Sequence, residues 1–308
     1  MASAKRDLLD ELSKADVNIL QVRAICRDHP GLIESNSSLR LRVWSLLLLK
    51  SNVISTASLP LPQESCIEQH VLEADVRRTR ATIAEFLSKE YQDALTHILQ
   101  TFCLQYKIQY KQGMNEILAP FLLIHSPSKG TLLTYHLFEA FILRYAERYV
   151  CQDDDSFLFK SFRLFSLLLT YHDPQLALHL LEQDFPPELY SPPWFLTLYS
   201  RSLPLKDVLR LWDLLIAWDD SAFTFFIGLC LLRRRRSALL AAQTDGIPDV
   251  IHDMYIHDDK EVDSLVSEAI ILYKSTPRCF CRCLRLCCVS STEVLTIINF
   301  SNEQQVYP

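Results

Sequence analysis

Helical periodicity of the apolar residues constrains the fold of this chain more than any other feature. Apolar side chains recur three and four residues apart in successive segments from residue 5 to residue 274. No obvious strand precedes residues 292–300, and that stretch is too short to form a sheet alone. The chain also contains only five glycines in 308 residues. We therefore predict an all-α fold of two packed sub-bundles, with no β-sheet of consequence.

Composition excludes several classes of protein. Hydrophobic residues make up 49% and charged residues 22% of the chain, which is ordinary for a globular protein. The net charge of −6 argues against a general nucleic-acid binder, so no nucleic-acid partner is expected. The longest near-apolar run, residues 221–232, is shorter than the roughly twenty residues that a membrane span needs. We expect residues 221–232 to form a buried core helix.

The N-terminus gives no indication of secretion. Residues 1–16 are charged throughout and show no secretory signal.

The ten cysteines fall into two groups. The first five are scattered in apolar surroundings, as is typical of reduced core cysteines in a cytosolic protein. The other five lie at positions 279, 281, 283, 287 and 288, interleaved with arginine and aliphatic residues. This composition suits reversible S-palmitoylation near a membrane. An ordinary reduced, partly buried segment is the alternative, while the spacing disfavours a tetrahedral zinc site.

The motif YKQGMN, Tyr110–Asn115, lies between two long apolar helical patterns and holds one of the five glycines. A glycine in such a helical chain marks a place where the backbone must turn or be approached closely. The phenol and the two amides can orient a group and donate hydrogen bonds, but they are not nucleophiles at neutral pH. The motif therefore suits binding of a water or an oxyanion. The alternative is a polar turn between two core helices.

Three other stretches accompany this motif. They are LRLRVW at residues 39–44, LEADVRRT at residues 72–79, and WFLTLY at residues 194–199 followed by LPL and VLRLWD up to Asp213. Their order and content resemble the TBC domain, the all-helical catalytic domain of Rab GTPase-activating proteins. The family patterns are LRxxVW, IxxDxxRT, YxQGMN and WFLTLF…LPxxxVLRxWD. The resemblance covers roughly residues 31 to 240.

The resemblance implies how such a domain acts. GTP hydrolysis builds charge on the transferred phosphoryl group, and an arginine supplied in trans accelerates it by roughly 10³–10⁵-fold, while a glutamine amide orients the attacking water. TBC domains supply both groups. Carried onto this sequence, the arginine finger is Arg78 and the glutamine finger is Gln112, which are 112 − 78 = 34 residues apart. Arg77 is a less favoured candidate, because Arg78 immediately precedes Thr79 as the motif requires.

The same resemblance assigns four residues that shape the site: Asp75, Tyr110, Gly113 and Asn115. Two departures from the family pattern lie nearby. Leu72 stands where the family has isoleucine, and Arg80-Ala81 replaces the TP dipeptide that often follows RT.

The resemblance also predicts the organisation of the chain. We expect an N-terminal helical extension at residues 1–30, a TBC domain at 31–277 and a Cys-rich C-terminal tail at 278–308. The later segments look most like a trafficking subgroup in which a TBC domain precedes a rhodanese-like domain. Only 31 residues follow Pro277, against about 100 in a typical domain. We therefore expect either that a rhodanese-like domain is absent or that the chain is truncated.

The implied partner is a Rab-family small GTPase in its GTP form, which would hold both GTP and Mg²⁺. No cofactor or metal of the chain's own is expected, since Walker A, GxGxxG, HExxH and paired CxxC motifs are missing. Such an activator has no independent turnover. The predicted location is cytoplasmic, with peripheral contact to Golgi or endosomal membranes through the tail. The alternatives are a catalytically idle TBC scaffold in vesicle tethering and a helical interaction module unrelated to GTPases; the presence of both Arg78 and Gln112 favours the activator.

Overall fold

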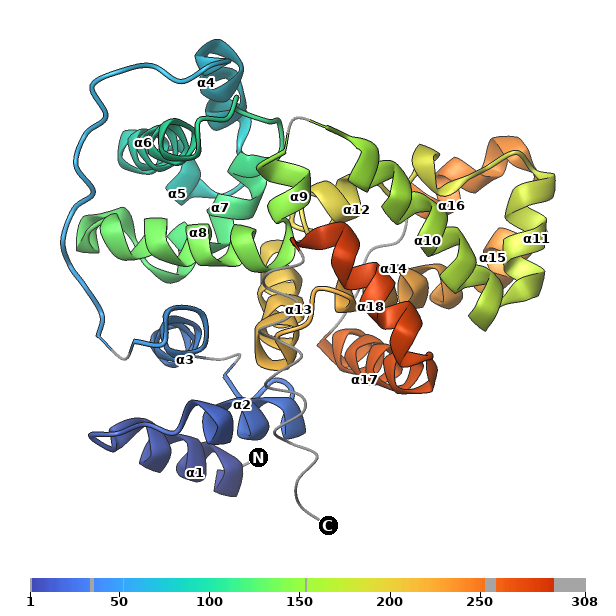
Figure 1. The fold of residues 1–308 in the computed structure, drawn as a ribbon, viewed down its shortest axis with the longest axis horizontal. Helices are drawn as coiled ribbons and strands as arrows, with labels where there is room; N and C mark the ends of the chain where they lie inside the picture. The colour runs from blue at the N-terminus through green and yellow to red at the C-terminus, as the bar shows by residue number, and fades with distance from the viewer. Residues whose placement is uncertain (1, 34–35, 52, 153, 253–258, 291–308) are drawn as a thin grey trace. The chain divides into compact units, whose positions relative to one another are not determined.

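The computed structural model describes residues 2–33, 36–51, 53–152, 154–252 and 259–290. These residues form helices and connecting turns and contain no strand, which confirms the all-α prediction (Figure 1). The stretch 292–300 lies outside the described residues. The chain divides into two compact units. Unit 1 comprises Met1–Ile142 and Thr197–Asp219, and unit 2 comprises Leu143–Leu196 and Asp220–Pro308.

Unit 1 is a helical bundle around an aromatic core. Phe121 lies at the centre, with ring centroids 5.6 Å from Trp44 and 5.5 Å from Trp212, and Phe141 lies 4.2 Å from Trp212. The helices that carry the first three rings pack on one another (Figure 1). The helices of this unit are α1 (Ala2–Ser13), α2 (Ile19–Asp28), α3 (Ser37–Leu49), α4 (Gln69–Arg78), α5 (Ala84–Leu87), α6 (Lys89–Tyr106), α7 (Met114–Ile124), α8 (Leu132–Tyr145) as far as Ile142, and α13 (Leu205–Trp218).

A largely buried ion pair joins α3 to α13. Arg40 donates from Nε to Asp213 Oδ1 at 3.0 Å and from Nη2 to Oδ2 at 2.9 Å, and Trp44 Nε1 donates to Oδ1 at 2.8 Å. An acid within an apolar run requires such partners, because an unpaired buried charge is costly. Two of the sequence motifs, LRLRVW and VLRLWD, therefore meet here.

The N-terminal helices belong to the same unit. α2 packs on α13 and α3. Arg23 in α2 lies 3.2 Å from Asp219 Oδ2 through Nη2 and donates from Nη1 to the carbonyl of Ile216 at 2.8 Å. The predicted extension at residues 1–30 thus contributes to the packing of unit 1.

Unit 2 is a second helical bundle with its own aromatic core. The ring centroids of Phe165 and Phe195 lie 5.6 Å apart, and those of Phe195 and Phe225 lie 4.8 Å apart. Buried residues run from Phe223 to Leu232 in α14, as predicted for the long apolar run, and α14 packs on α17. No described helix is long and apolar enough to cross a membrane. The helices of this unit are α9 (Glu147–Val150), α10 (Ser156–His172), α11 (Pro174–Glu182), α12 (Pro192–Leu196), α14 (Phe223–Arg234), α15 (Arg236–Ala241), α16 (Ile247–His252), α17 (Asp259–Ser275) and α18 (Arg278–Cys288).

The Cys-rich segment forms α18, which packs on α9 and α10. Arg285 donates to both carboxylate oxygens of Asp220, at 2.7 and 2.6 Å, and to the hydroxyl of Tyr273 at 2.8 Å. The start of the predicted tail is therefore integrated into unit 2, whereas residues 291–308 lie outside the described part of the chain. Three of the five cysteines in α18 are buried and two are exposed: Cys281, Cys287 and Cys288 against Cys279 and Cys283.

Candidate functional site

The candidate site forms where the end of α4 meets the turn that leads into α7. α4 ends at Arg78, and Thr79 leaves the helix with φ −61° and ψ 117°. The hydroxyl of Thr79 donates back to the carbonyl of Asp75 at 2.8 Å, which satisfies one of the carbonyls left over at a helix C-terminus. The RT motif therefore lies at a defined helix end, where a side chain can project beyond the helix.

Gly113 sets the turn of the YKQGMN motif. It precedes α7 with φ +106°, a conformation that strongly favours glycine. A Cβ atom at this position would lie 2.9 Å from Cγ2 of Thr197, inside normal contact distance. Thr197 comes from the WFLTLY segment. The predicted need for close backbone approach at Gly113 is thus explained by both the backbone conformation and the neighbouring side chain.

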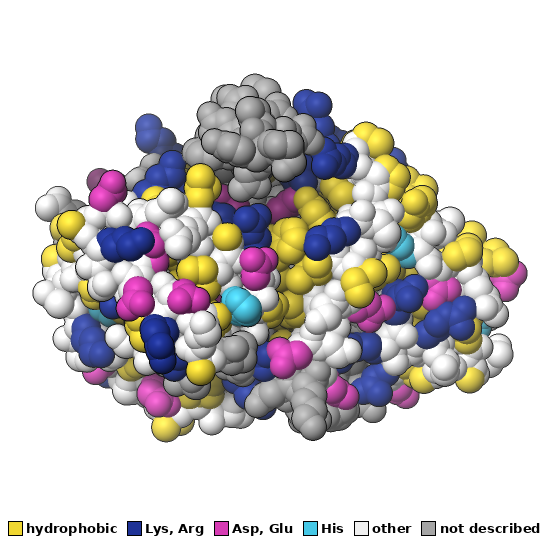
Figure 2. Space-filling view, turned by 90° about the horizontal axis from the view of Figure 1, so that it is seen from below, with side chains coloured by type: hydrophobic (Ala, Val, Ile, Leu, Met, Phe, Trp, Pro, Cys, Tyr) yellow, Lys and Arg dark blue, Asp and Glu magenta, His cyan; other side chains and the backbone are white. Residues whose placement is uncertain are grey.

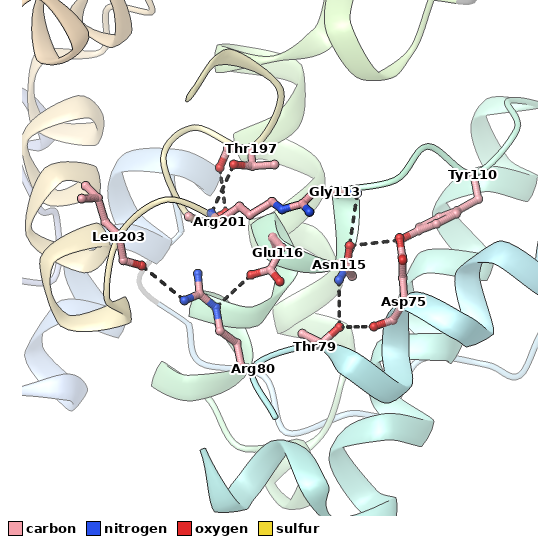
Figure 3. A network of polar contacts seen from close by, with 11 residues as sticks. Asp75, Thr79, Arg80, Tyr110, Gly113, Asn115, Glu116, Thr197, Arg201 and Leu203 are labelled. Carbon is pink, nitrogen blue, oxygen red and sulfur yellow. Dashed lines mark hydrogen bonds and ion pairs between the residues drawn. The ribbon is translucent and has the colours of Figure 1, made fainter. Parts of the chain in front are cut away.

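A buried polar network joins these two segments (Figure 3). Its members are Asp75, Thr79, Tyr110, Gly113 and Asn115. The hydroxyl of Tyr110 lies 2.8 Å from Asp75 Oδ2 and 3.0 Å from Asn115 Oδ1. The Asn115 amide donates to the Thr79 hydroxyl at 2.8 Å, and its oxygen accepts from the Gly113 N–H at 3.2 Å. Burial and the neighbouring Asp75 raise the pKa of Tyr110 well above its usual range, so the phenol remains a hydrogen-bond donor.

Arg78 projects from this network into solvent. Its Nη2 donates to Asp75 Oδ1, while 61% of its side chain is exposed and only 1% of the Asp75 side chain is. Asp75 therefore uses one carboxylate oxygen for Arg78 and the other for Tyr110. A buried acid thus fixes the direction of an exposed arginine. Arg77 is also exposed, but among the described residues its side chain has no ion-pair or hydrogen-bond partner.

Gln112 lies on the same turn as Gly113 and is exposed. Within the described part of the chain, no hydrogen bond engages its side-chain amide. The contacts of Tyr110 with Asp75 and of Asn115 with Thr79 bring the segments of Gln112 and Arg78 together across the intervening sequence. The structure therefore places both predicted finger residues at exposed positions, on two segments that are joined by side-chain hydrogen bonds.

Three residues next to this network were not among the predicted site residues: Arg80, Glu116 and Thr197. Nε of Arg80 lies 2.8 Å from Glu116 Oε2, and Nη1 of Arg80 donates to the carbonyl of Leu203 at 3.2 Å. Thr197 covers Gly113. Two signals pointed to the charged residues: Arg80 departs from the family pattern, and Glu116 is the one charged residue of α7.

Two observations bear on other ligands. Among the described residues, no group of three or more His, Cys, Asp or Glu side chains could hold a metal ion. On the face that Figure 2 shows, lysine and arginine side chains lie among aspartate and glutamate side chains. That pattern differs from the continuous basic surface typical of nucleic-acid binders.

Known proteins resemble this chain in sequence. Residues 37–240 match the family model of the Rab-GTPase-TBC domain. TBC domain-containing protein kinase-like proteins from Gallus gallus and Homo sapiens are each 30% identical over 208 residues, which is 67% of this chain and 23% of each relative. Mitotic check point protein BUB2 from Saccharomyces cerevisiae is 29% identical over 213 residues, 64% of this chain and 68% of that protein. The chain thus spans 23% of the length of the two kinase-like relatives.

Two solved structures share the fold. The Ypt/Rab-GAP domain of Gyp1p matches with a TM-score of 0.67 and 17% identity, covering 89% of this chain and 98% of that one. The Chlamydomonas flagellar RabGAP TBC domain matches with a TM-score of 0.64 and 18% identity, covering 88% and 92%.

Proposed function

Because the chain belongs to the Rab-GTPase-TBC domain family, we propose that it accelerates GTP hydrolysis by a Rab-family small GTPase in its GTP form. Arg78 is the arginine finger and Gln112 the glutamine finger. One observation carries the proposal. Arg78 is exposed yet aligned by the buried Asp75, and its segment is bonded to the turn that presents Gln112.

The chemistry of the two side chains fits these roles. A guanidinium has five N–H donors, and the contact of Arg78 with Asp75 uses one of its two terminal nitrogens. Outward-facing donors therefore remain for the oxygens of a phosphoryl group, where charge develops during hydrolysis. The Gln112 amide has both a donor and an acceptor, which are the groups needed to orient an attacking water.

The other residues of the network act on geometry. Tyr110 and Asn115 connect the Gly113 turn to α4 and have no exposed reactive atom of their own. The nucleotide and Mg²⁺ would come with the GTPase. The chain would contribute the docking surface, the guanidinium of Arg78 and the amide of Gln112. Preorganised groups of this kind act without reorganising at the moment of reaction.

A test of the proposal measures single-turnover GTP hydrolysis by a panel of purified Rab proteins, with and without the chain. We expect acceleration of at least one Rab, lost when Arg78 is replaced by alanine. Stable binding of a GTP-loaded Rab without acceleration of any member of the panel would instead support the idle scaffold.

We further propose that S-acylation of α18 falls on Cys279 and Cys283. These two cysteines are exposed and lie one helical turn apart, next to the exposed Arg278 and Arg282. An acyl chain on this face would lie beside two cations that attract anionic lipid headgroups. Membrane contact would then depend on two thiols, because the other three cysteines of α18 are buried.

A further inference from the structure

We infer that Arg80 and Glu116 form a strut that fixes the spacing of the two finger-bearing segments, so that both are positioning residues for Arg78 and Gln112. The inference rests on the proposed function for its kinetic consequence, but not for its structural one. Arg80 follows Arg78 by two residues, and Glu116 follows Gln112 by four. A contact between Arg80 and Glu116 therefore acts directly on both finger segments.

The geometry of the pair supports this role. Arg80 Nε lies 2.8 Å from Glu116 Oε2, and only 14% and 16% of the two side chains are exposed (Figure 3). The next residues back along the chain, Thr79 and Asn115, are hydrogen-bonded to each other. Consecutive residues of one segment thus meet consecutive residues of the other. The hydrogen bond between Asn115 and Thr79 fixes the distance between the two segments at one position. The ion pair between Arg80 and Glu116 fixes that distance again at the next residue of each segment.

Arg80 also connects a third segment. Its Nη1 donates to the carbonyl of Leu203, which lies shortly after Thr197, the residue that covers Gly113. The backbone of Arg80 has φ +47°, an uncommon conformation for a residue with a side chain. Such a conformation persists where the surrounding contacts determine it. Arg80 is therefore placed by contacts on two sides rather than by local preference.

Stability alone does not account for the pair. The close approach of Arg80 Nε to Glu116 Oε2 lacks hydrogen-bond alignment, and Arg80 Nη2 is buried without a hydrogen-bond partner among the described residues. Burial lowers the pKa of Arg80 and raises that of Glu116, so both charges lose hydration. Buried ion pairs are often no more stabilising than apolar residues of the same volume. An apolar pair of the same volume would pack between the two segments, but it would not hold two particular atoms at a fixed distance.

The test compares Arg80→Met with a matched control, Arg23→Met. Arg23 is also a largely buried arginine of unit 1, with 12% of its side chain exposed, and it contacts one acid and three backbone carbonyls. It is bonded to neither finger segment. Each variant is measured by thermal melting, by amide hydrogen exchange of residues 76–83 and 110–117, and by GTP hydrolysis of a responsive Rab at increasing activator concentration.

We expect Arg80→Met to speed amide exchange in both finger segments and to lower kcat by about 10- to 100-fold with little change in KM, since small misplacements of catalytic groups cost this much. Arg23→Met should lower the melting temperature similarly and leave kcat and the exchange of both finger segments unchanged. Glu116→Gln, which keeps the shape of the side chain, should reproduce Arg80→Met. Arg80→Lys should regain most of the rate, because an ammonium still reaches the carboxylate.

The inference is wrong if Arg80→Met and Arg23→Met show the same kcat and the same amide exchange in the two finger segments. If Arg80→Met does not fold, Glu116→Gln decides by the same comparison. If the unaltered chain accelerates no Rab, the proposed function fails, yet the exchange measurements still decide whether the two finger segments are coupled through Arg80 and Glu116.

Discussion

The side-chain amide of Asn115 donates a 2.8 Å hydrogen bond to the hydroxyl of Thr79, and this bond joins the first turn of α7 to the end of α4. Both side chains are buried. The Thr79 hydroxyl donates its own proton to the carbonyl of Asp75, so it accepts and donates at once. A single hydroxyl group therefore connects the acid that aligns Arg78 with the turn that presents Gln112.

Thr79→Val tests this bond. Valine keeps the shape of threonine but leaves the buried Asn115 amide without its acceptor, which costs about 1–3 kcal/mol. Thr170→Val is the control, because the Thr170 hydroxyl also donates to the carbonyl four residues earlier, at 2.9 Å, but is exposed. We expect that control to change the free energy of unfolding by at most about 0.5 kcal/mol. Equal losses in the two variants, measured by urea denaturation, would show that the Asn115 contact contributes nothing.

Arg78→Ala should remove most of the acceleration of GTP hydrolysis, within the roughly 10³–10⁵-fold range of arginine fingers. Arg78→Lys should also be damaging, because an ammonium lacks the planar fork that contacts two oxygens at once. Arg77→Ala is the control, since Arg77 is exposed, adjacent and not aligned by an acid among the described residues. Arg77→Ala should leave the melting temperature unchanged, whereas Arg78→Ala should lower it, because Arg78→Ala removes the guanidinium that pairs with the buried Asp75. Greater loss in Arg77→Ala than in Arg78→Ala would reassign the finger.

Gln112→Ala should lower the rate of hydrolysis by a similar or smaller factor than Arg78→Ala, because the amide orients water and does not neutralise charge. The side chain is exposed and contributes little packing, so the thermal melt should be unchanged. Gln21→Ala, at an exposed position of α2, serves as the control for loss of an amide. Full activity of Gln112→Ala in single-turnover assays would reject its role as a finger.

Gly113→Ala should destabilise the fold. The φ of +106° strains any residue with a Cβ by about 1–3 kcal/mol, and the new methyl group would also meet Thr197. Gly246→Ala should change stability in the opposite direction, by about 0.4–1 kcal/mol, because its φ is not positive and its added Cβ would be 3.7 Å from Ala242. Denaturation curves that show equal effects for the two glycines would contradict the assigned turn geometry.

The cysteines of α18 should differ in reactivity. Burial raises the pKa of Cys281 to about 11 and that of Cys288 to about 12, so few of these thiols ionise at neutral pH. Cys279 and Cys283 are exposed and should be alkylated first in the native protein, as peptide mapping by mass spectrometry would show. The same two positions should carry any thioester found by acyl exchange. Uniform alkylation of all five cysteines under native conditions would contradict the packing of α18.

The sequence by itself determined the fold class, whereas the candidate site residues were predicted from the resemblance to the TBC domain family. Apolar residues at helical spacing predict helices wherever they occur, because one helix face must be buried regardless of its partner. Asp213 lies in an apolar run, where a buried acid requires a partner, and Arg40 and Trp44 supply an ion pair and a hydrogen bond. The glycine of the YKQGMN motif predicted a turn or close approach, and both are present at Gly113. These inferences depend only on the residue types and their spacing within a short segment, and both can be read directly from the sequence.

Only the tertiary structure decided which residues meet. Nothing in the local pattern around Arg80 indicates Glu116 or Leu203 as neighbours, and five cysteines of similar composition divide into buried and exposed sets only when α18 packs. Arg78 and Asp75 are a plausible surface pair in any helix, and it is Tyr110, 35 residues further along the chain, that makes Asp75 a buried aligning acid. The physical reason is that these contacts close long loops. Their partners are selected by the packing of whole helices, so no local window of sequence specifies them.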